Sequence, residues 1–285
     1  METSIRNNVC RNGNFTSSGI VALTKSGRRD MTDKELEQYK KDNPKGKRTT
    51  IDETFGDAAY TYICEKNMER RLGISLDSES NARPLVWGNF CEKRAFNTLG
   101  ITYKECSQET IQHPTILTWY GSPDGENFAS DKAVVEVKCP YTRKSFCQLV
   151  DPLYNGLTGI DVINAIRNGY IDNKGFKHKA HASGEDYYWQ MVSNSILTNS
   201  DFAELIVYLP YKSELEEIRE ATALADGNQN KLAWINFAED EDLPYLPDGG
   251  YYKNINVIRF KVPAEDKAAL ISRVEDASKL LVERL

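Results

Sequence analysis

The sequence predicts an α/β protein in which a small mixed β-sheet is flanked by helices, with a helical N-terminal part and a C-terminal helix. Two observations carry this prediction. Stretches with apolar residues at helical spacing, such as 54–72, alternate with short apolar runs typical of strands, such as 133–139. Prolines and glycines separate these stretches, and no internal repeat is present. We expect residues 1–285 to form a single domain.

Residues 1–80 are expected to be mainly helical. The hydroxyl side chains of residues 16–18 can cap a helix that runs to Leu23. The charged segment 40–48 contains proline and glycine and is expected to be an exposed loop. A further helix over 54–72 should end at Gly73, because glycine is favoured directly after a helix.

Residues 84–210 are the predicted core. Its expected elements are a helix over 84–100, strands over 115–120 and 133–139, a helix over 187–198 and a strand over 204–209. Residues 151–183 are rich in glycine and asparagine and contain one short helical stretch near 161–167. We therefore expect them to form an inserted, mobile loop.

Residues 211–285 are expected to close the domain with a strand and a helix. In order, they predict a charged helix over 211–225, an acidic turn region over 239–250, a strand over 255–262 and a long helix over 263–285. Leu270, Val274 and Leu281 fall on one side of that last helix, which should face the core.

The main candidate site combines an aspartate in a turn with a Glu-X-Lys triplet on an apolar strand. Asp124 lies in a Ser-Pro-Asp-Gly turn, and alternation along the following strand puts Glu136 and Lys138 on one face and Val135 and Val137 on the other. Buried charges need partners or a metal ion. Two acidic groups beside a lysine suit a hard divalent cation such as Mg²⁺. The motif therefore predicts a metal-dependent nuclease that hydrolyses phosphodiesters.

Each half of this motif is common by itself. The turn sequence recurs at 247–249 without a strand-borne triplet after it, and the triplet recurs at 265–267 at the start of a predicted helix. Pro-Asp-Gly is a frequent turn for purely conformational reasons. The prediction depends on the strand context and on the short separation between the two halves, because neither half is informative alone.

The arrangement of Asp124, Glu136 and Lys138 resembles the core motif of the PD-(D/E)XK nuclease superfamily. Glu92, in a predicted helix that begins shortly before Trp87-Gly88, is similar to an acidic residue of the lambda-exonuclease-like branch, which includes the YqaJ-type viral recombinases. The resemblance spans roughly residues 11–30 and 84–210. It is interrupted by the extended stretch after residue 140, and the linker over 225–250 also departs from it.

Further positions extend this resemblance. Gln190 is similar to a glutamine on the helix that follows the core in that branch, and Arg11 with Ser18 resembles an arginine–serine pair that engages DNA phosphate. A terminal phosphate would be held by a guanidinium fork and a helix N-terminus. From local sequence alone, Ser18 and Arg11 are a helix cap and a loop arginine, and Gln190 is a buried glutamine that caps a helix or bridges to the sheet.

The resemblance implies a restriction-endonuclease-like core and a set of roles. Asp124 and Glu136 would bind a metal ion together with the backbone carbonyl of Val137, and Glu92 would serve a second ion or a bound water. Lys138 would orient the attacking water and offset charge on phosphorus. We also expect a nearby metal and a dry strand face to depress the pKa of Lys138.

The implied activity is that of a Mg²⁺-dependent deoxyribonuclease, with Mn²⁺ as an alternative and one or two ions bound. It would be a 5′-to-3′ exonuclease on duplex DNA ends that leaves 3′ single-stranded tails for recombination. The resemblance also implies a homo-oligomer such as a ring-shaped trimer, a single-strand annealing protein as partner, and a bacterial or phage-infected cytoplasm. The alternatives are an endonuclease or nickase with the same site, an inactive DNA-end-binding protein, and a metal-binding regulator.

Composition excludes several other classes of protein. A net charge of −6 argues against a passive DNA coat, which would depend on many Lys and Arg contacts to phosphate. There is no apolar run long enough to cross a membrane and no apolar signal segment, so we expect no membrane association. The six cysteines are scattered and read as reduced thiols, and the three histidines show no ligand spacing.

Overall fold

The computed structural model of the chain describes residues 11–76, 82–106, 109–129, 131–224 and 229–283. Its centre is a five-stranded sheet with the order β12-β11-β8-β7-β4. These strands are β4 (Tyr103–Glu105), β7 (Gly125–Asn127), β8 (Ala133–Lys138), β11 (Phe202–Tyr208) and β12 (Ile255–Lys261). β8 and β11 are parallel, whereas the other neighbouring pairs are antiparallel. The predicted fold class, a mixed sheet flanked by helices, is confirmed.

β8 and β11 are central strands because their sequences are apolar on both faces. Nearly every residue of both strands is buried, as expected for a parallel pair covered by helices on each side. β12 lies at the edge and alternates between buried and exposed residues. This parallel pair therefore fixes the position of Glu136, whose register partner is Leu205.

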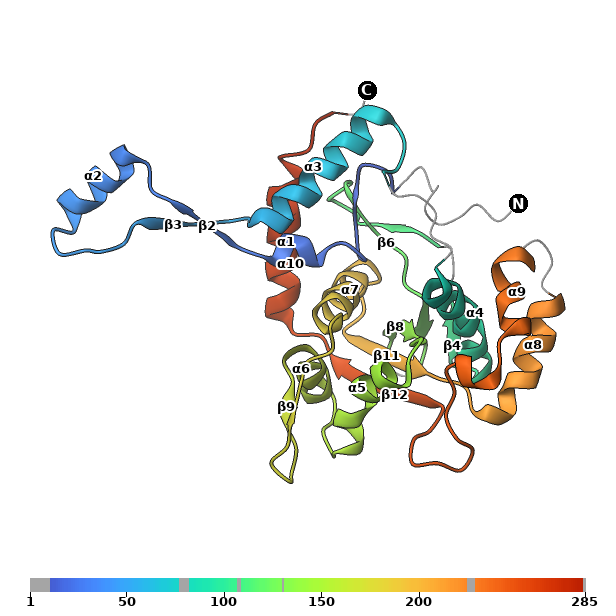
Figure 1. Cartoon of the computed structure of the whole chain (residues 1–285). Helices are drawn as coiled ribbons and strands as arrows, with labels where there is room; N and C mark the ends of the chain where they lie inside the picture. Colours follow the sequence, from blue (N-terminus) through green and yellow to red (C-terminus); the bar gives the residue numbers. More distant parts are fainter. Residues whose placement is uncertain (1–10, 77–81, 107–108, 130, 225–228, 284–285) are drawn as a thin grey trace.

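Helices cover both faces of the sheet (Figure 1). They are α1 (Val21–Thr24), α2 (Asp33–Asp42), α3 (Asp57–Leu72), α4 (Arg83–Thr98), α5 (Arg143–Tyr154), α6 (Ile160–Asn168), α7 (Gly184–Leu197), α8 (Leu215–Leu224), α9 (Gln229–Phe237) and α10 (Ala264–Ser278), with 3₁₀ turns η2 (Lys212–Glu214) and η3 (Asp240–Asp242). Val134 packs in the core formed with α5, α6 and α7, whereas Val135 and Val137 pack with α4, α8 and α9. The alternation predicted for this strand is confirmed.

A second, three-stranded sheet carries the N-terminal segment to the region of Asp124. β1 (Phe15–Thr16) pairs in parallel with β6 (Trp119–Gly121), which also pairs with β5 (Ile111–Gln112). The Ser17 hydroxyl lies 2.7 Å from that of Ser193 on α7, which also accepts from Trp119 Nε1 at 2.9 Å. β1, β6 and α7 are thus joined through one buried hydrogen-bonded group.

The predicted helix cap at residues 16–18 is wrong. The backbone N–H of Ser17 donates to Tyr120 O at 3.0 Å, and its hydroxyl contacts Ser193 rather than a helix terminus. α1 is only four residues long, and its N-cap residue, Ile20, makes no side-chain capping bond. Pairing of β1 with β6 overrides the local preference of these hydroxyl residues for a cap.

The expected inserted loop over 151–183 is also wrong in most of its length, although α6 confirms the short helical stretch predicted near 161–167. α5 continues to Tyr154, and α6 contributes buried residues to the main core: Val162, Ile163 and Ile166. Only the short hairpin of β9 (Tyr170–Ile171) and β10 (Lys177–His178) extends from this layer. The glycines in this segment do not all indicate a loop. Gly159 directly precedes α6 and Gly169 directly follows it, and both have positive φ.

Other boundaries follow the sequence closely. α3 ends at Gly73, which has φ +72°, and α4, α7, β11 and β12 lie within a few residues of the predicted spans. α10 is shorter than expected and ends at Ser278. Within residues 11–76, the N-terminal part combines helices with strands: β2 (Gly27–Asp30) and β3 (Thr50–Glu53) form an antiparallel ribbon that carries α2 away from the body (Figure 1).

None of the helices in the described ranges combines the length and the apolar character needed to cross a membrane. The described cysteines are free thiols: Cys64, Cys91, Cys106, Cys139 and Cys147. Cys10 lies outside the described residues.

Gly121 on β6 lies close to Ser17 and to α7, and it can do so because it has no side chain. A Cβ at Gly121 would lie 2.5 Å from Asn194 Oδ1 and closer still to atoms of Ser17 and Leu197. We predict that Gly121→Ala lowers the free energy of unfolding by about 1–3 kcal/mol through overpacking. Thermal unfolding followed by circular dichroism measures this. Gly100→Ala, at a site with open space, is the matched control, and equal melting temperatures for the two variants would contradict the packing described.

Candidate active site

Asp124 and Glu136 meet at one corner of the central sheet. Asp124 lies in the turn between β6 and β7, and the antiparallel pairing of β7 with β8 brings this turn beside the end of β8. Asp124 Oδ2 accepts a hydrogen bond from the backbone N–H of Val137 at 2.7 Å. The two carboxyl groups are close enough to share a hydrogen bond when one carries a proton. The sequence motif is therefore assembled in space.

Lys138 is tied to the same corner. Its Nζ donates to Glu136 Oε1 at 2.5 Å and lies 4.8 Å from the ring centre of Tyr187 on α7. Glu136 is only 1% exposed, whereas the Lys138 side chain is 21% exposed. Asn194, also on α7, donates through Nδ2 to Glu136 Oε2 at 3.5 Å. Lys138 thus lies at the boundary between the buried carboxylates and the solvent.

Burial and mutual repulsion shift the titration of these groups. Burial, followed by repulsion from Asp124, raises the pKa of Glu136 to about 8. Glu92 on α4 also has its pKa raised to about 8, first by burial and then by the charges of Asp124 and Glu136. Burial raises the pKa of Asp124 above its usual value. The ionised forms of all three carboxyl groups are therefore held at an energetic cost.

The depressed pKa expected for Lys138 beside a metal ion stays a prediction. The groups that the protein itself supplies act in the opposite direction. Burial acts to lower this pKa, but the carboxylates of Glu136 and Asp124 outweigh burial, and the net shift is upward. The ammonium form is therefore stable across the neutral range. Lys138 is equipped to act as a cationic hydrogen-bond donor rather than as a base.

The corner holds more acidic than basic side chains. Asp124, Glu136 and Glu105 all act on Glu92, and Lys138 is the cation that acts on Glu92, Asp124 and Glu136. Glu105 Oε1 is buried without a hydrogen-bond partner among the described residues. We call these four acidic side chains the acidic cluster. A divalent cation fits it, because a cation would favour the ionised form of the buried carboxyl groups and supply the missing electrostatic partner.

The donor set also suits magnesium more than zinc. Within the described ranges, no three Asp, Glu, His or Cys side chains are arranged to hold a metal ion by themselves. Mg²⁺ is usually bound by one or two carboxylates and keeps several water molecules. Asp124 and Glu136 are the residues that would hold such an ion, with the carbonyl of Val137 as the further oxygen ligand expected from the sequence.

Glu92 and Gln190 reach the site from opposite faces of the sheet. α4 approaches the end of β8 closely, and a Cβ on Gly88 would lie 3.9 Å from Cys139 O. On α7, Gln190 lies between Tyr187 and Asn194 at helical spacing and so shares the face that contacts Lys138 and Glu136. Gln190 is half-buried and makes no side-chain hydrogen bond within the described part of the chain.

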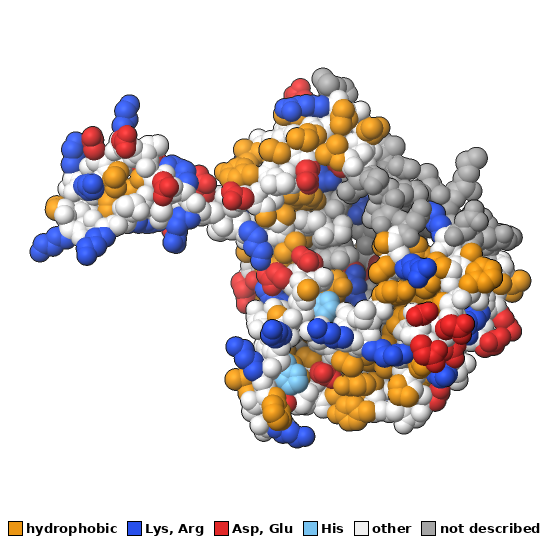
Figure 2. Space-filling view, viewed as in Figure 1, with side chains coloured by type: hydrophobic (Ala, Val, Ile, Leu, Met, Phe, Trp, Pro, Cys, Tyr) orange, Lys and Arg blue, Asp and Glu red, His pale blue; other side chains and the backbone are white. Residues whose placement is uncertain are grey.

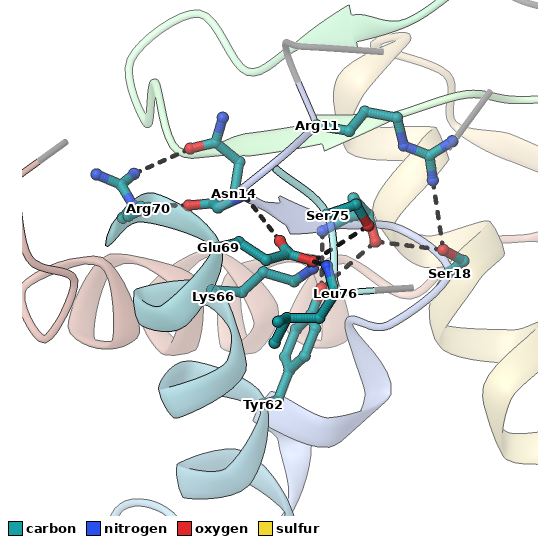
Figure 3. Close-up of polar contacts among 11 residues, drawn as sticks. Arg11, Asn14, Ser18, Tyr62, Lys66, Glu69, Arg70, Ser75 and Leu76 are labelled. Carbon is teal, nitrogen blue, oxygen red and sulfur yellow. Dashed lines mark hydrogen bonds and ion pairs between the residues drawn. The ribbon is translucent and has the colours of Figure 1, made fainter. Parts of the chain in front are cut away.

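Arg11 and Ser18 form a separate polar group (Figure 3). Arg11 Nη2 donates to Ser18 Oγ at 3.5 Å, and Ser18 Oγ lies 3.2 Å from Thr16 Oγ1. The backbone N–H of Thr16 donates to the hydroxyl of Tyr62 on α3 at 3.0 Å. A cavity of about 430 Å³ opens beside them, lined by Thr16, Ser18, Gly19, Tyr62, Glu65, Lys66, Glu69 and Leu76.

Glu69 holds the segment that carries Arg11. Glu69 is 3% exposed and accepts from Gly13 N and from Lys66 Nζ, both at 2.8 Å (Figure 3). The next residue, Arg70, donates to Gly13 O at 2.6 Å and to Asn14 Oδ1 at 2.9 Å. α3 thus fixes the turn between Arg11 and β1 through two adjacent charged residues.

Sequence analysis did not single out several of these residues. Asn194 and Glu105 reach the acidic cluster from elements whose local sequence gives no sign of it, and Glu69 reads as one more charged position of a helix. Their signal is the burial of a polar side chain, which only the fold reveals.

Three aromatic residues of α4 and α7 belong to the core. Trp87, Tyr188 and Trp189 are buried, whereas Tyr187 is half-buried beneath Lys138. The histidines are structural, as expected. His113 accepts from Ile116 N at 3.0 Å, and the other two contact Ser145 and Asp172.

Comparison with known proteins adds evidence on the fold. No protein-family model matches the chain, and no curated protein matches its sequence. A phage-related exonuclease from Haemophilus somnus 129PT superposes with a TM-score of 0.50 at 13% identity, over 94% of this chain and 92% of that chain. The two chains share a fold. An alkaline exonuclease from Laribacter hongkongensis superposes with a TM-score of 0.48 at 15% identity, over 95% and 89%.

The Glu69 carboxylate predicts a pH-dependent contribution to stability. Burial raises its pKa, but the hydrogen bonds from Lys66 and Gly13 outweigh burial, and the net shift is downward. Its contribution is therefore present above the unfolded pKa, near 4.3, and is lost as pH falls through the folded pKa. We predict that Glu69→Gln costs about 1–3 kcal/mol at neutral pH and that the difference from wild type shrinks below about pH 4.

Urea unfolding at several pH values measures this difference. Glu65→Gln, an exposed change on the same helix, is the control and should leave stability nearly unchanged at every pH. A difference between wild type and Glu69→Gln that stays constant from pH 7 to acid would contradict the role given to the Glu69 carboxylate.

Proposed function

We propose that this protein is a metal-dependent DNA exonuclease that acts on duplex ends. The observation that carries the proposal is the acidic cluster, in which Asp124 and Glu136 lie beside Lys138 at the end of β8. The shared fold with a phage-related exonuclease supports it. Asp124 and Glu136 would hold Mg²⁺ or Mn²⁺, as one or two ions, with the carbonyl of Val137, and Glu92 would serve a second ion or a bound water.

The side chains divide the chemistry among them. A bound divalent ion supplies Lewis acidity and charge neutralisation at the scissile phosphate. Glu136 holds Lys138 in its ammonium form. Lys138 donates hydrogen bonds to the attacking water and to the phosphoryl oxygens, on which negative charge develops. Gln190, which does not titrate, orients the water or the phosphate through its amide.

Arg11 and Ser18 favour action at an end over action within a duplex. A guanidinium and a hydroxyl that already contact each other can both donate to a terminal phosphate. β1 pairs with β6, and Ser17 contacts Ser193 on α7, so this group is rigidly connected to the elements that carry Asp124 and Asn194. We therefore propose that a DNA end held at Ser18 sets the position of the strand at the acidic cluster.

The finer features rest on the resemblance alone. We propose 5′-to-3′ polarity, 3′ single-stranded products used in recombination, a ring-shaped homo-oligomer such as a trimer, and cooperation with a single-strand annealing protein. The setting would be the cytoplasm of a bacterium or of a phage-infected host. The rivals, an endonuclease or nickase with the same residues and an inactive end-binding protein, are outcomes of the next experiment.

A single assay separates these functions. The protein is incubated with Mg²⁺ and with linear duplexes labelled at one 5′ or one 3′ end, with and without a 5′ phosphate. Closed circular DNA is tested beside them. We expect label to be released from 5′ ends and the circle to stay intact. Lys138→Ala should lower the rate of hydrolysis at least 100-fold, because it removes the donor at the reacting phosphate. Lys104→Ala, an exposed lysine on β4, is the control.

The outcomes are distinct. Nicking or linearisation of the circle would favour the endonuclease. Binding of ends without hydrolysis by the wild-type protein would favour the inactive end-binding protein. Full activity of Lys138→Ala would overturn the assignment of the site.

A further inference from the structure

A charged arm projects from the body of the protein (Figure 1). It consists of Gly27–Glu53 and is built from the ribbon of β2 and β3 with α2 at its outer end. No residue of the arm is buried, and α2 has no buried side chain although it is ten residues long. A two-stranded ribbon with an unpacked helix is marginal in water unless other interactions hold it. The arm therefore adds nothing to the core.

Ion pairs give the arm a defined shape. Arg29 bridges α2 and the ribbon by pairing with Glu35 at 2.7 Å and with Glu53 at 3.1 Å. Arg28 pairs with Asp52 across the two strands at 2.9 Å. A capping box between Thr32 and Glu35 fixes the start of α2. These contacts occupy much of the acidic charge near the ribbon.

The outer end of the arm is basic. Residues 40–48 contain five basic residues and a single acidic one, so this segment carries +4 in a chain of net charge −6. Arg48 pairs with Asp52, but the lysines of this segment make no ion pair with any described residue. We call them the tip lysines: Lys40, Lys41, Lys45 and Lys47. All four are exposed, and Figure 2 shows Lys and Arg side chains spread over the outer part of the arm.

We propose that the tip lysines bind the phosphate backbone of duplex DNA at a distance from the acidic cluster. This inference rests on the proposed function for the identity of the ligand. The arm begins nine residues after Ser18, where we place the DNA end, so both follow from one short stretch of chain. Unpaired lysines on an exposed surface match a row of phosphates, and such contacts position a duplex without reading its sequence.

A second copy of the chain fits the arm less well. Interfaces between protein copies bury an apolar centre and are depleted in lysine. The outer end of the arm offers lysines, and its aromatic residue, Tyr39, lies against Gly46 within the arm. DNA needs no apolar surface at this point. The chemistry of the arm tip therefore favours a polyanion.

The length of the arm gives the proposal a scale. Each strand of the ribbon has four residues and spans roughly 13 Å at about 3.3 Å per residue. α2 adds up to about 15 Å. At about 3.4 Å per base pair, the ribbon alone corresponds to roughly four base pairs and the ribbon with α2 to roughly eight. A duplex of about 8 base pairs should occupy the end site and barely reach the tip lysines, whereas one of about 40 base pairs should contact them.

The test compares two triple variants in the full chain. One carries Lys41→Ala, Lys45→Ala and Lys47→Ala in the arm. The matched control carries Lys253→Ala, Lys261→Ala and Lys279→Ala, which are exposed lysines of the body. Fluorescence anisotropy without divalent ions measures the affinity for both duplex lengths over a series of salt concentrations, so that binding is measured without hydrolysis.

We expect the arm variant to bind the long duplex roughly 10-fold more weakly. The slope of log affinity against log salt should fall by roughly two to three, because each lost phosphate contact removes about 0.9. Its affinity for the short duplex should match that of wild type. The control should behave as wild type with both duplexes.

Each other outcome overturns the proposal. An unchanged salt slope for the arm variant, or an equal loss in the control, would exclude specific contact by the tip lysines. A change in oligomeric state by light scattering, with unchanged DNA binding, would show that the arm contacts a second copy. Hydrolysis of the short duplex by the wild-type protein with Mg²⁺ tests the proposed function separately, since that duplex does not require the arm.

Discussion

A surplus of carboxyl groups over basic groups in a buried corner is the constraint on which the rest of the structure depends. Four carboxyl groups and Lys138 interact where the turn before β7 meets the end of β8. Glu136 is fixed there by the parallel pair of β8 and β11, so it cannot move toward solvent without breaking the central sheet. Buried ionisable groups with an energetic cost of this kind are typical of functional sites. Oxygen donors suit a divalent cation as their partner.

The same arrangement explains how distant segments cooperate. β1 carries Ser17 and Ser18 to β6, and the Ser17 hydroxyl contacts Ser193 on the helix that also carries Asn194. Glu69 and Arg70 on α3 hold the preceding turn, which carries Arg11. A DNA end bound at Ser18 would therefore be held rigidly relative to Asp124, while the arm would engage the duplex farther out.

The sequence predicted the parts of the site whose signal is local. Asp124, Glu136 and Lys138 lie within fifteen residues of one another, so a turn and one strand were enough to bring them together. Asn194 and Glu105 reach the site through tertiary packing, which no spacing rule reports. The same limit explains the errors in the fold. Pairing with β6 decided the structure at residues 16–18, and burial in the main core decided that α6 is not part of a loop.

Metal binding to the acidic cluster tests the central claim most directly. Thermal unfolding of the wild-type protein with increasing Mg²⁺, at constant ionic strength, should show a rising melting temperature, equivalent to about 2.7 kcal/mol when Mg²⁺ reaches 100 times its Kd. Asp124→Asn should abolish most of that rise. If neither Mg²⁺ nor Mn²⁺ changes the melting temperature of the wild-type protein, or if Asp124→Asn responds equally, the buried carboxylates are not a cation site.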